Sequence, residues 1–113
     1  MSFKFEAGKA KAEIEDIEVD EKFIDIYKMI LLKAAKKFFG EHIEYNSDDV
    51  IVRGIILGEI RNMVRYGHAY CPCRIQKIRE HICPCEPAKE EIRRNGICTC
   101  KLFIDPSIYK PKA

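Results

Sequence analysis

The six cysteines of this 113-residue chain lie within thirty residues, as three Cys-x-Cys pairs. We call them the first pair (Cys71 and Cys73), the second pair (Cys83 and Cys85) and the third pair (Cys98 and Cys100). Thiolates bind soft metals and attack disulfides, so this cluster indicates a metal centre, thiol chemistry, or both. Four thiolates complete an iron–sulfur cluster or a zinc site, which leaves two for a redox-active disulfide.

Several kinds of site use clustered cysteines. Zinc sites mostly space their cysteines as Cys-x-x-Cys, so zinc with two spectator cysteines is one alternative. A framework of structural disulfides is typical of secreted chains, and unrelated core cysteines would not repeat a Cys-Pro-Cys triplet. We favour a cubane iron–sulfur cluster with four cysteine ligands beside a redox disulfide. The two thiols of a Cys-x-Cys unit point in different directions, so one can bind iron while the other faces a substrate, and a proline between them holds the segment rigid.

Charge is distributed unevenly along the chain. Residues 61–101, which hold all the cysteines, carry nine Lys or Arg and four acids, whereas residues 1–20 carry three Lys and six acids. A basic rim around a redox site would steer an acidic partner toward it, and a merely solvated face is the alternative. We also expect Arg74 or Lys101 to lower the pKa of a nearby thiol.

The first twenty residues bear on localisation. Met1–Asp20 has no apolar core of the kind a secretory signal needs, and the apolar stretch near Met29–Leu32 is too short to span a bilayer. We therefore expect a cytoplasmic protein without a membrane partner. In a reducing compartment, clustered cysteines are more often metal-binding or catalytic than structural.

The elements that must position the cysteines are predicted to be helical. Residues 1–20 read as a weakly specified N-terminal arm, with a helical turn or two over Ala10–Glu15. Apolar residues at helical spacing predict a helix over 21–39, begun by Asp20 and ended by Gly40. The core-facing residues of this helix are expected to be Phe23, Ile26, Tyr27, Ile30, Leu31, Ala34, Ala35 and Phe38.

A second helix is predicted over 48–65, opened by Asn46 and Ser47 and ended by Gly67. Its apolar content is Val50, Ile51, Ile55, Leu57, Ile60 and Val64. The four-residue spacing of Gly54 and Gly58 would permit close packing against another helix.

Two spacers separate the cysteine pairs. Residues 74–82 can form about two helical turns, and 86–97 a helix with Pro87 in its first turn and a stop at Asn95-Gly96. Residues 101–113 are predicted to pack back on the core as a short extended segment. The fold class is therefore mainly α: a small helical domain over 21–113, organised around a 4Fe-4S cluster.

Read in order, the three pairs resemble the catalytic (beta) subunit of ferredoxin:thioredoxin reductase. The matching motifs are Tyr70-Cys-Pro-Cys-Arg74, Cys83-Pro-Cys85, and Cys98-Thr-Cys100 followed by Leu102 and Phe103. That family has CPC, CPC and CHC in this order, with an Arg after the first pair and two apolar residues after the last. Val52–Tyr70 also resembles the helix before the first CPC, so the resemblance covers roughly residues 28–106.

Carried over by position, the resemblance implies a role for each cysteine. Cys71, Cys83, Cys85 and Cys98 would ligate a 4Fe-4S cluster, whereas Cys73 and Cys100 would form the active-site disulfide. Cys73 would be the outer thiol that attacks the substrate, and Cys100 the inner thiol held against the cluster.

The function implied by the resemblance is that of a ferredoxin-dependent disulfide (thioredoxin) reductase. Ferredoxin or a similar one-electron donor would reduce the active-site disulfide through the cluster, and a thioredoxin-like protein would be the acceptor. The family leaves room for a small second subunit. We expect no nucleic-acid partner, because Tyr66 and Tyr70 alone make no stacking platform for bases. The alternative is a non-enzymatic zinc-binding interaction module whose basic region meets nucleic acid or protein.

The chain departs from the family at two points. The spacers between the pairs differ in length, which leaves the order of the motifs intact. Thr99 stands where the family has a His that is thought to assist proton transfer at the disulfide. We interpret His68 and His81 each as a surface or core histidine without this task, and the alternative is that one of them replaces the family His.

Overall fold

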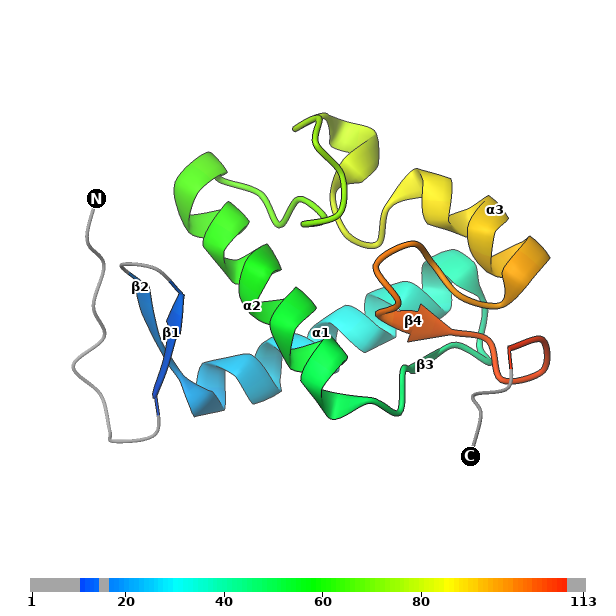
Figure 1. Ribbon diagram of the computed structural model, residues 1–113, viewed down its shortest axis with the longest axis horizontal. Helices are drawn as coiled ribbons and strands as arrows, with labels where there is room; N and C mark the ends of the chain where they lie inside the picture. The colour runs from blue at the N-terminus through cyan, green and yellow to red at the C-terminus, as the bar shows by residue number, and fades with distance from the viewer. Residues whose placement is uncertain (1–10, 15–16, 110–113) are drawn as a thin grey trace.

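The computed structural model describes residues 11–14 and 17–109, and within them it is mainly helical, as predicted. Its elements are β1 (Lys11–Ile14), β2 (Ile17–Asp20), α1 (Glu21–Phe39), β3 (Glu44–Tyr45), α2 (Asp49–Tyr66), the 3₁₀ turn η1 (Arg79–His81), α3 (Glu86–Asn95) and β4 (Phe103–Ile104). Two antiparallel ribbons, β1–β2 and β3–β4, accompany the helices. Figure 1 shows α1 passing behind α2 toward α3, with the cysteine-bearing loops between α2 and α3.

Helix α1 has the predicted bounds but not the whole predicted core face. The Asp20 side chain accepts a hydrogen bond from the backbone N–H of Lys22 at 2.7 Å and so caps the helix. The buried residues are Ile24, Leu31 and Ala35. The expectation was wrong for Phe23, Ile26 and Ile30, which are 38%, 52% and 60% exposed, and for Ala34, which is exposed as well. Apolar residues cover more of this helix than the single stripe that faces the core.

Helix α2 begins and ends close to the predicted residues. The Asp48 side chain accepts from the backbone N–H groups of Val50 and Ile51, so Asp48 caps the helix, and the expectation that Asn46 and Ser47 open it was wrong. Gly67 ends the helix in the left-handed conformation. Val50, one of the apolar residues of the predicted helix, has a side chain that is 82% exposed. The buried stripe instead includes Val52, Ile56 and Ile60, together with two polar residues, Glu59 and Asn62.

The two glycines of α2 do not form a helix-packing motif, so that expectation was wrong. A Cβ on Gly58 would lie 2.7 Å from Cγ of Pro72, the proline of the first pair, whereas a Cβ on Gly54 would meet no atom within 4 Å. Gly58 therefore lets the Cys71-Pro72-Cys73 segment lie directly on α2.

This contact predicts opposite effects for two similar substitutions. Gly58→Ala should lower the free energy of unfolding by about 1–3 kcal/mol, because the rigid proline ring must move to admit a methyl group. Gly54→Ala should raise it by about 0.4–1 kcal/mol, because alanine restricts the unfolded chain at an unhindered helical position. Denaturant unfolding of both variants tests this, and an equal effect at the two positions would contradict the contact.

Near the N-terminus the structure differs from the sequence-based expectation. Lys11–Ile14 is a strand paired with Ile17–Asp20, so the predicted helical turn over Ala10–Glu15 was wrong there, and Ala10 and Glu15 lie outside the described residues. Val19 is fully buried and joins the core. The boundary between an arm over 1–20 and a domain over 21–113 stays a prediction.

The spacer over 74–82 also differs, because only Arg79–His81 forms a 3₁₀ turn rather than two helical turns. An antiparallel bridge joins Ile82, the last residue of the spacer, to Tyr70, which precedes the first pair, so the chain must double back between them. Helix α3 was predicted correctly, with Pro87 in its first turn and Gly96 in the left-handed conformation at its end. The extended C-terminal segment is confirmed at β4, and residues 110–113 lie outside the described ones.

No helix in the described ranges is long and apolar enough to cross a membrane.

Candidate metal and redox centre

The first and second pairs begin where two short backbone segments pair with each other, at residues 69–71 and 81–83. The backbone N–H of Cys71 donates to the carbonyl of His81 at 2.8 Å, and that of Cys83 donates to the carbonyl of Ala69 at 3.0 Å. These bonds flank the Tyr70–Ile82 bridge. Two cysteine pairs twelve residues apart in sequence are therefore adjacent in space because the backbone ladder aligns them.

The first pair occupies a tight turn against α2. The N–H of Arg74 donates to the carbonyl of Cys71 at 3.1 Å and closes the turn. Pro72 rests on Gly58, and the buried side chain of Asn62 donates to the carbonyl of Tyr70 at 2.8 Å. Helix α2 thus fixes both the entry and the middle of this turn.

The third pair occupies a turn that is closed in the same way as the turn of the first pair. The N–H of Lys101 donates to the carbonyl of Cys98 at 2.9 Å, and Lys101 has a φ of 67°, an uncommon left-handed value for a residue with a side chain. The Asn46 side chain holds this conformation by donating to the Lys101 carbonyl at 2.9 Å. The N–H of Cys98 donates to the carbonyl of Phe103, which connects the turn to β4.

These turns bring three sulfur atoms together. The Sγ atoms of Cys71, Cys73 and Cys100 all lie within 4.8 Å of one another. Those of Cys71 and Cys100 are in disulfide contact, with Cα atoms 7.7 Å apart. Disulfide Cα separations are usually about 4.4–6.8 Å, so we interpret the contact as two sulfurs that converge on one centre. The pairing expected from the resemblance, Cys73 with Cys100, stays a prediction.

The other three cysteines, Cys83, Cys85 and Cys98, are not part of this group of sulfurs but influence one another electrostatically. Burial raises the pKa of Cys83 well above its ordinary value, and Glu59 and the other two cysteines raise it further. Burial also raises the pKa of Cys98, against hydrogen bonds from the backbone near Phe103. A thiol with a raised pKa in a buried site favours the neutral form unless a cation or metal stabilises the thiolate.

Two donors point at these sulfurs. The N–H of Phe103 lies 3.5 Å from Sγ of Cys98, and the Arg74 guanidinium lies 3.7 Å from Sγ of Cys85. N–H groups directed at cysteine sulfurs are a feature by which proteins tune iron–sulfur clusters. The soft, largely buried donor set therefore fits an iron–sulfur centre.

Exposure separates Cys73 from the other cysteines. All six lie in the described part of the chain, and Cys73 is exposed whereas Cys71, Cys85, Cys98 and Cys100 are buried and Cys83 is half-buried. The pKa of Cys73 is nevertheless raised, because the partial burial of its thiol outweighs the positive charge of Arg74. Arg74 does act to lower this pKa, as expected, but its effect is smaller than that of burial.

Arg74 is engaged elsewhere, with Glu91 of α3. Its Nη2 lies 2.9 Å from both carboxylate oxygens of Glu91. The same carboxylate accepts from the backbone N–H of Thr99 at 2.9 Å and from its Oγ1 at 2.7 Å. Burial raises the pKa of Glu91, but the hydrogen bonds from Thr99 and Arg74 outweigh it and leave the pKa lowered.

Glu59 is a second acidic residue that the sequence analysis missed. It is fully buried, its Oε1 accepts from the Tyr27 hydroxyl at 2.8 Å, and Oε2 has no partner among the described residues. Burial raises its pKa to about 7, against hydrogen bonds from Cys83 and Tyr27. Helical periodicity could have found it, because position 59 lies on the apolar stripe of Val52 and Ile56.

The two histidines considered as substitutes for the family His have other contacts. Nδ1 of His81 lies 3.1 Å from the carbonyl oxygen of Gln76, and the His68 ring packs edge-on against Tyr70. Glu91, and neither of these histidines, is the residue to which the Thr99 hydroxyl donates a hydrogen bond.

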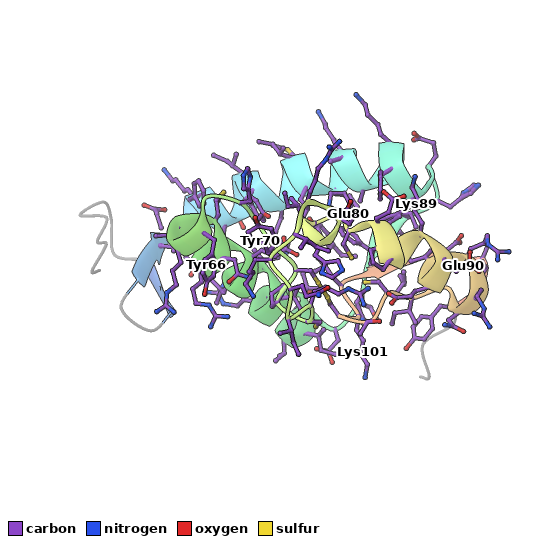
Figure 2. All side chains as sticks on the ribbon, turned by 90° about the horizontal axis from the view of Figure 1, so that it is seen from above. Tyr66, Tyr70, Glu80, Lys89, Glu90 and Lys101 are labelled. Carbon is purple, nitrogen blue, oxygen red and sulfur yellow. A yellow bond between two sulfur atoms is a disulfide. The ribbon has the colours of Figure 1, made fainter. Side chains whose placement is uncertain are left out.

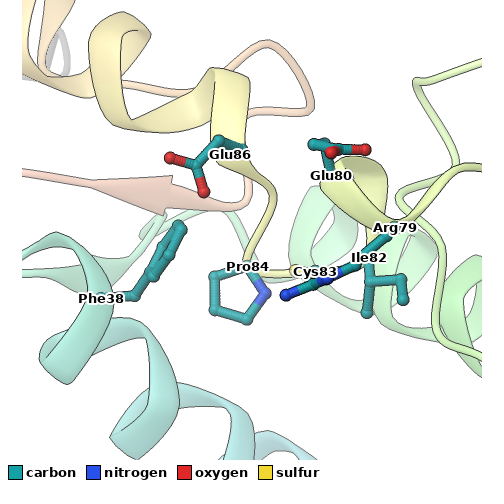
Figure 3. A pocket seen from close by; sticks show the side chains of 7 residues that line it. All are labelled: Phe38, Arg79, Glu80, Ile82, Cys83, Pro84 and Glu86. Atoms are coloured by element: carbon teal, nitrogen blue, oxygen red, sulfur yellow. The ribbon is translucent and has the colours of Figure 1, made fainter.

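A cavity of about 610 Å³ opens beside the second pair (Figure 3). It is lined by Phe38, Arg79, Glu80, Ile82, Cys83, Pro84 and Glu86. Figure 3 shows Phe38 of α1 on one side of Pro84, with Arg79 and Glu80 on the other. The cavity therefore gives surface access to the edge of the second pair.

Comparison with known proteins agrees with the cysteine pattern. The family model described as "Ferredoxin thioredoxin reductase catalytic beta chain" matches residues 17–113, which include all three pairs and all three α-helices. A search of curated proteins found no match.

Proposed function

Because the chain belongs to the ferredoxin thioredoxin reductase catalytic beta chain family, we propose that it reduces thioredoxin-like disulfides with electrons from ferredoxin or a similar one-electron donor. Membership makes it an oxidoreductase with an iron–sulfur centre. The observation that carries the proposal further is the group of three sulfurs from the first and third pairs within 4.8 Å of one another. One of them, Cys73, is exposed and can reach another protein.

We further propose that the centre is a 4Fe-4S cluster held by Cys71, Cys83, Cys85 and Cys98. Three of these are at most 5% exposed, which suits a cluster shielded from solvent. The N–H of Phe103 and the Arg74 guanidinium would donate to two of the four ligand sulfurs. When bound, such a cluster supplies electrons one at a time to the neighbouring disulfide.

The remaining cysteines, Cys73 and Cys100, divide the thiol chemistry. Two electrons and two protons convert their disulfide into two thiols. The exposed Cys73 thiolate attacks a substrate sulfur, which forms a mixed disulfide and releases one substrate thiolate. Cys100, 7% exposed, then attacks the Cys73 sulfur, so the second substrate thiolate leaves and the internal disulfide re-forms.

Exposure and ion pairing are the grounds on which we choose the cations that would steer an acidic donor. Arg74 is only 15% exposed and paired with Glu91, and Arg93 is paired with Glu90. Lys77 and Arg79 in the spacer between the first two pairs and Lys101 after the third pair are exposed, and Figure 2 shows Lys101 at the edge of the molecule. We propose that these three contribute most to the attraction of ferredoxin.

Reversing the charge of Lys77, Arg79 and Lys101 together should lower the association rate constant with an acidic ferredoxin by about tenfold at low salt. The difference from the wild type should shrink as salt rises, because screening removes the attraction. Stopped-flow kinetics measures both effects. Lys22→Glu is the control, because Lys22 is in the first turn of α1 and Figure 1 shows this end of the helix away from the loops between α2 and α3. A loss that does not depend on salt would contradict steering.

The proposed function is tested on protein purified without oxygen. It should contain about four iron and four sulfide per chain and should reduce a thioredoxin disulfide when reduced ferredoxin is supplied. Stoichiometric zinc without sulfide would favour the zinc-binding interaction module instead. The small second subunit and the cytoplasmic location stay predictions.

A further inference from the structure

We infer that Glu91 is a positioning residue that locks the turn of the first pair to the turn of the third pair and so sets the approach of Cys73 to Cys100. The inference rests on the proposed function and extends it to a residue outside the Cys-x-Cys motifs. Glu91 lies on α3, and its carboxylate is held by Arg74 from one turn and Thr99 from the other.

Each of these partners is next to a proposed redox thiol in the sequence. Arg74 follows Cys73 directly, and Thr99 precedes Cys100 directly. The Glu91 carboxylate therefore spans the two segments that must approach each other when the disulfide forms. A shift of either turn would change the separation of the two sulfurs, which lie within 4.8 Å here.

The contact differs from an ordinary surface ion pair. Glu91 receives four hydrogen-bond contacts from two loops, one of them from a backbone N–H, and the Arg74 side chain is 15% exposed. Charged bonds of this kind at partly buried sites are stronger and better defined than exposed pairs. The neighbouring Glu90 pairs with Arg93 three residues along the same helix, so that pair links no separate segments.

Thr99 is the residue at which this chain departs from the family's third motif. The hydroxyl that stands at the family's His position is committed to the Glu91 carboxylate. Thr99, which differs from the family motif, is thus hydrogen-bonded to Glu91. In the absence of the family His, the bonds of Glu91 to Arg74 and Thr99 align the turns of the first and third pairs.

The test uses the cluster-containing protein with Glu91→Ala, Glu91→Gln and the matched control Glu90→Ala. Glu91→Ala should keep the visible absorbance of the cluster but lower kcat for thioredoxin reduction at least tenfold, with KM within twofold, because misalignment slows attack without removing the docking surface. The equilibrium constant for closing the Cys73–Cys100 disulfide against glutathione should also fall at least tenfold. Glu91→Gln should lower kcat and the disulfide equilibrium constant less than Glu91→Ala does, since an amide keeps some of these hydrogen bonds.

Two readouts separate this inference from the function on which it rests. Absence of thioredoxin reduction in the wild type would refute the proposed function, while the disulfide equilibrium would still test the role of Glu91. Values for Glu91→Ala equal to those of Glu90→Ala in both measurements would overturn the inference. Loss of cluster absorbance in Glu91→Gln as well as Glu91→Ala would also overturn it, because the residue would then support the fold as a whole.

Discussion

Cys73→Ser should abolish disulfide reduction while the protein keeps its iron. The exposed Cys73 is the proposed nucleophile and lies outside the proposed ligand set, so the loss of its thiol removes attack but not cluster binding. Turnover should fall by several orders of magnitude, as is usual when a nucleophile is removed. Iron content, visible absorbance and turnover with a thioredoxin disulfide are the measurements.

Cys100→Ser should have the same two effects for a different reason, because the mixed disulfide can no longer be resolved. The variants should differ in their electron paramagnetic resonance spectra, since Cys73→Ser leaves the thiol of Cys100 beside the cluster and Cys100→Ser removes it. Cys71 provides the counter-test, because its sulfur is in contact with that of Cys100. Retained iron in Cys71→Ser together with lost iron in Cys73→Ser would show that the roles within the first pair are reversed.

Local sequence signals predicted the helices well, because each helix end has its own chemistry. Asp20 and Asp48 cap α1 and α2 with side-chain oxygens, and Gly67 and Gly96 adopt the left-handed conformation that ends a helix. Gly40 ends α1 where the sequence placed a stop. These features depend on neighbours within four residues, so the sequence shows them directly.

The contacts between distant segments were not predictable in this way. Helical periodicity marks positions suited to a core but does not say which of several apolar stripes on α1 other segments cover. Ile30, for example, lies at a helical apolar position and is 60% exposed. Gly58 looked like a helix-packing residue, yet its partner is Pro72 in a loop. Glu91 contacts Arg74, 17 positions before it, and Thr99, 8 positions after it, and no sequence motif includes Glu91.

The second large effect is expected at Cys85, where Cys85→Ser should lose both iron and the folded state. Cys85 is 4% exposed, lies directly before α3 and receives a contact from Arg74, so it connects the proposed cluster to the helix that carries Glu91. A buried substitution of this size alone usually costs about 1–3 kcal/mol. Structural metal binding in small domains contributes on the order of 10 kcal/mol, so its loss would exceed the stability of a domain this size.

Cys73→Ser is the matched control, because it makes the same chemical change at an exposed cysteine outside the proposed ligand set. Circular dichroism, thermal unfolding and iron analysis of both variants give the comparison. The wild type stripped of iron by a chelator should resemble Cys85→Ser, since both lack the same cross-link between the loops and α3. A Cys85→Ser protein that keeps its iron and melts within a few degrees of Cys73→Ser would remove Cys85 from the ligand set.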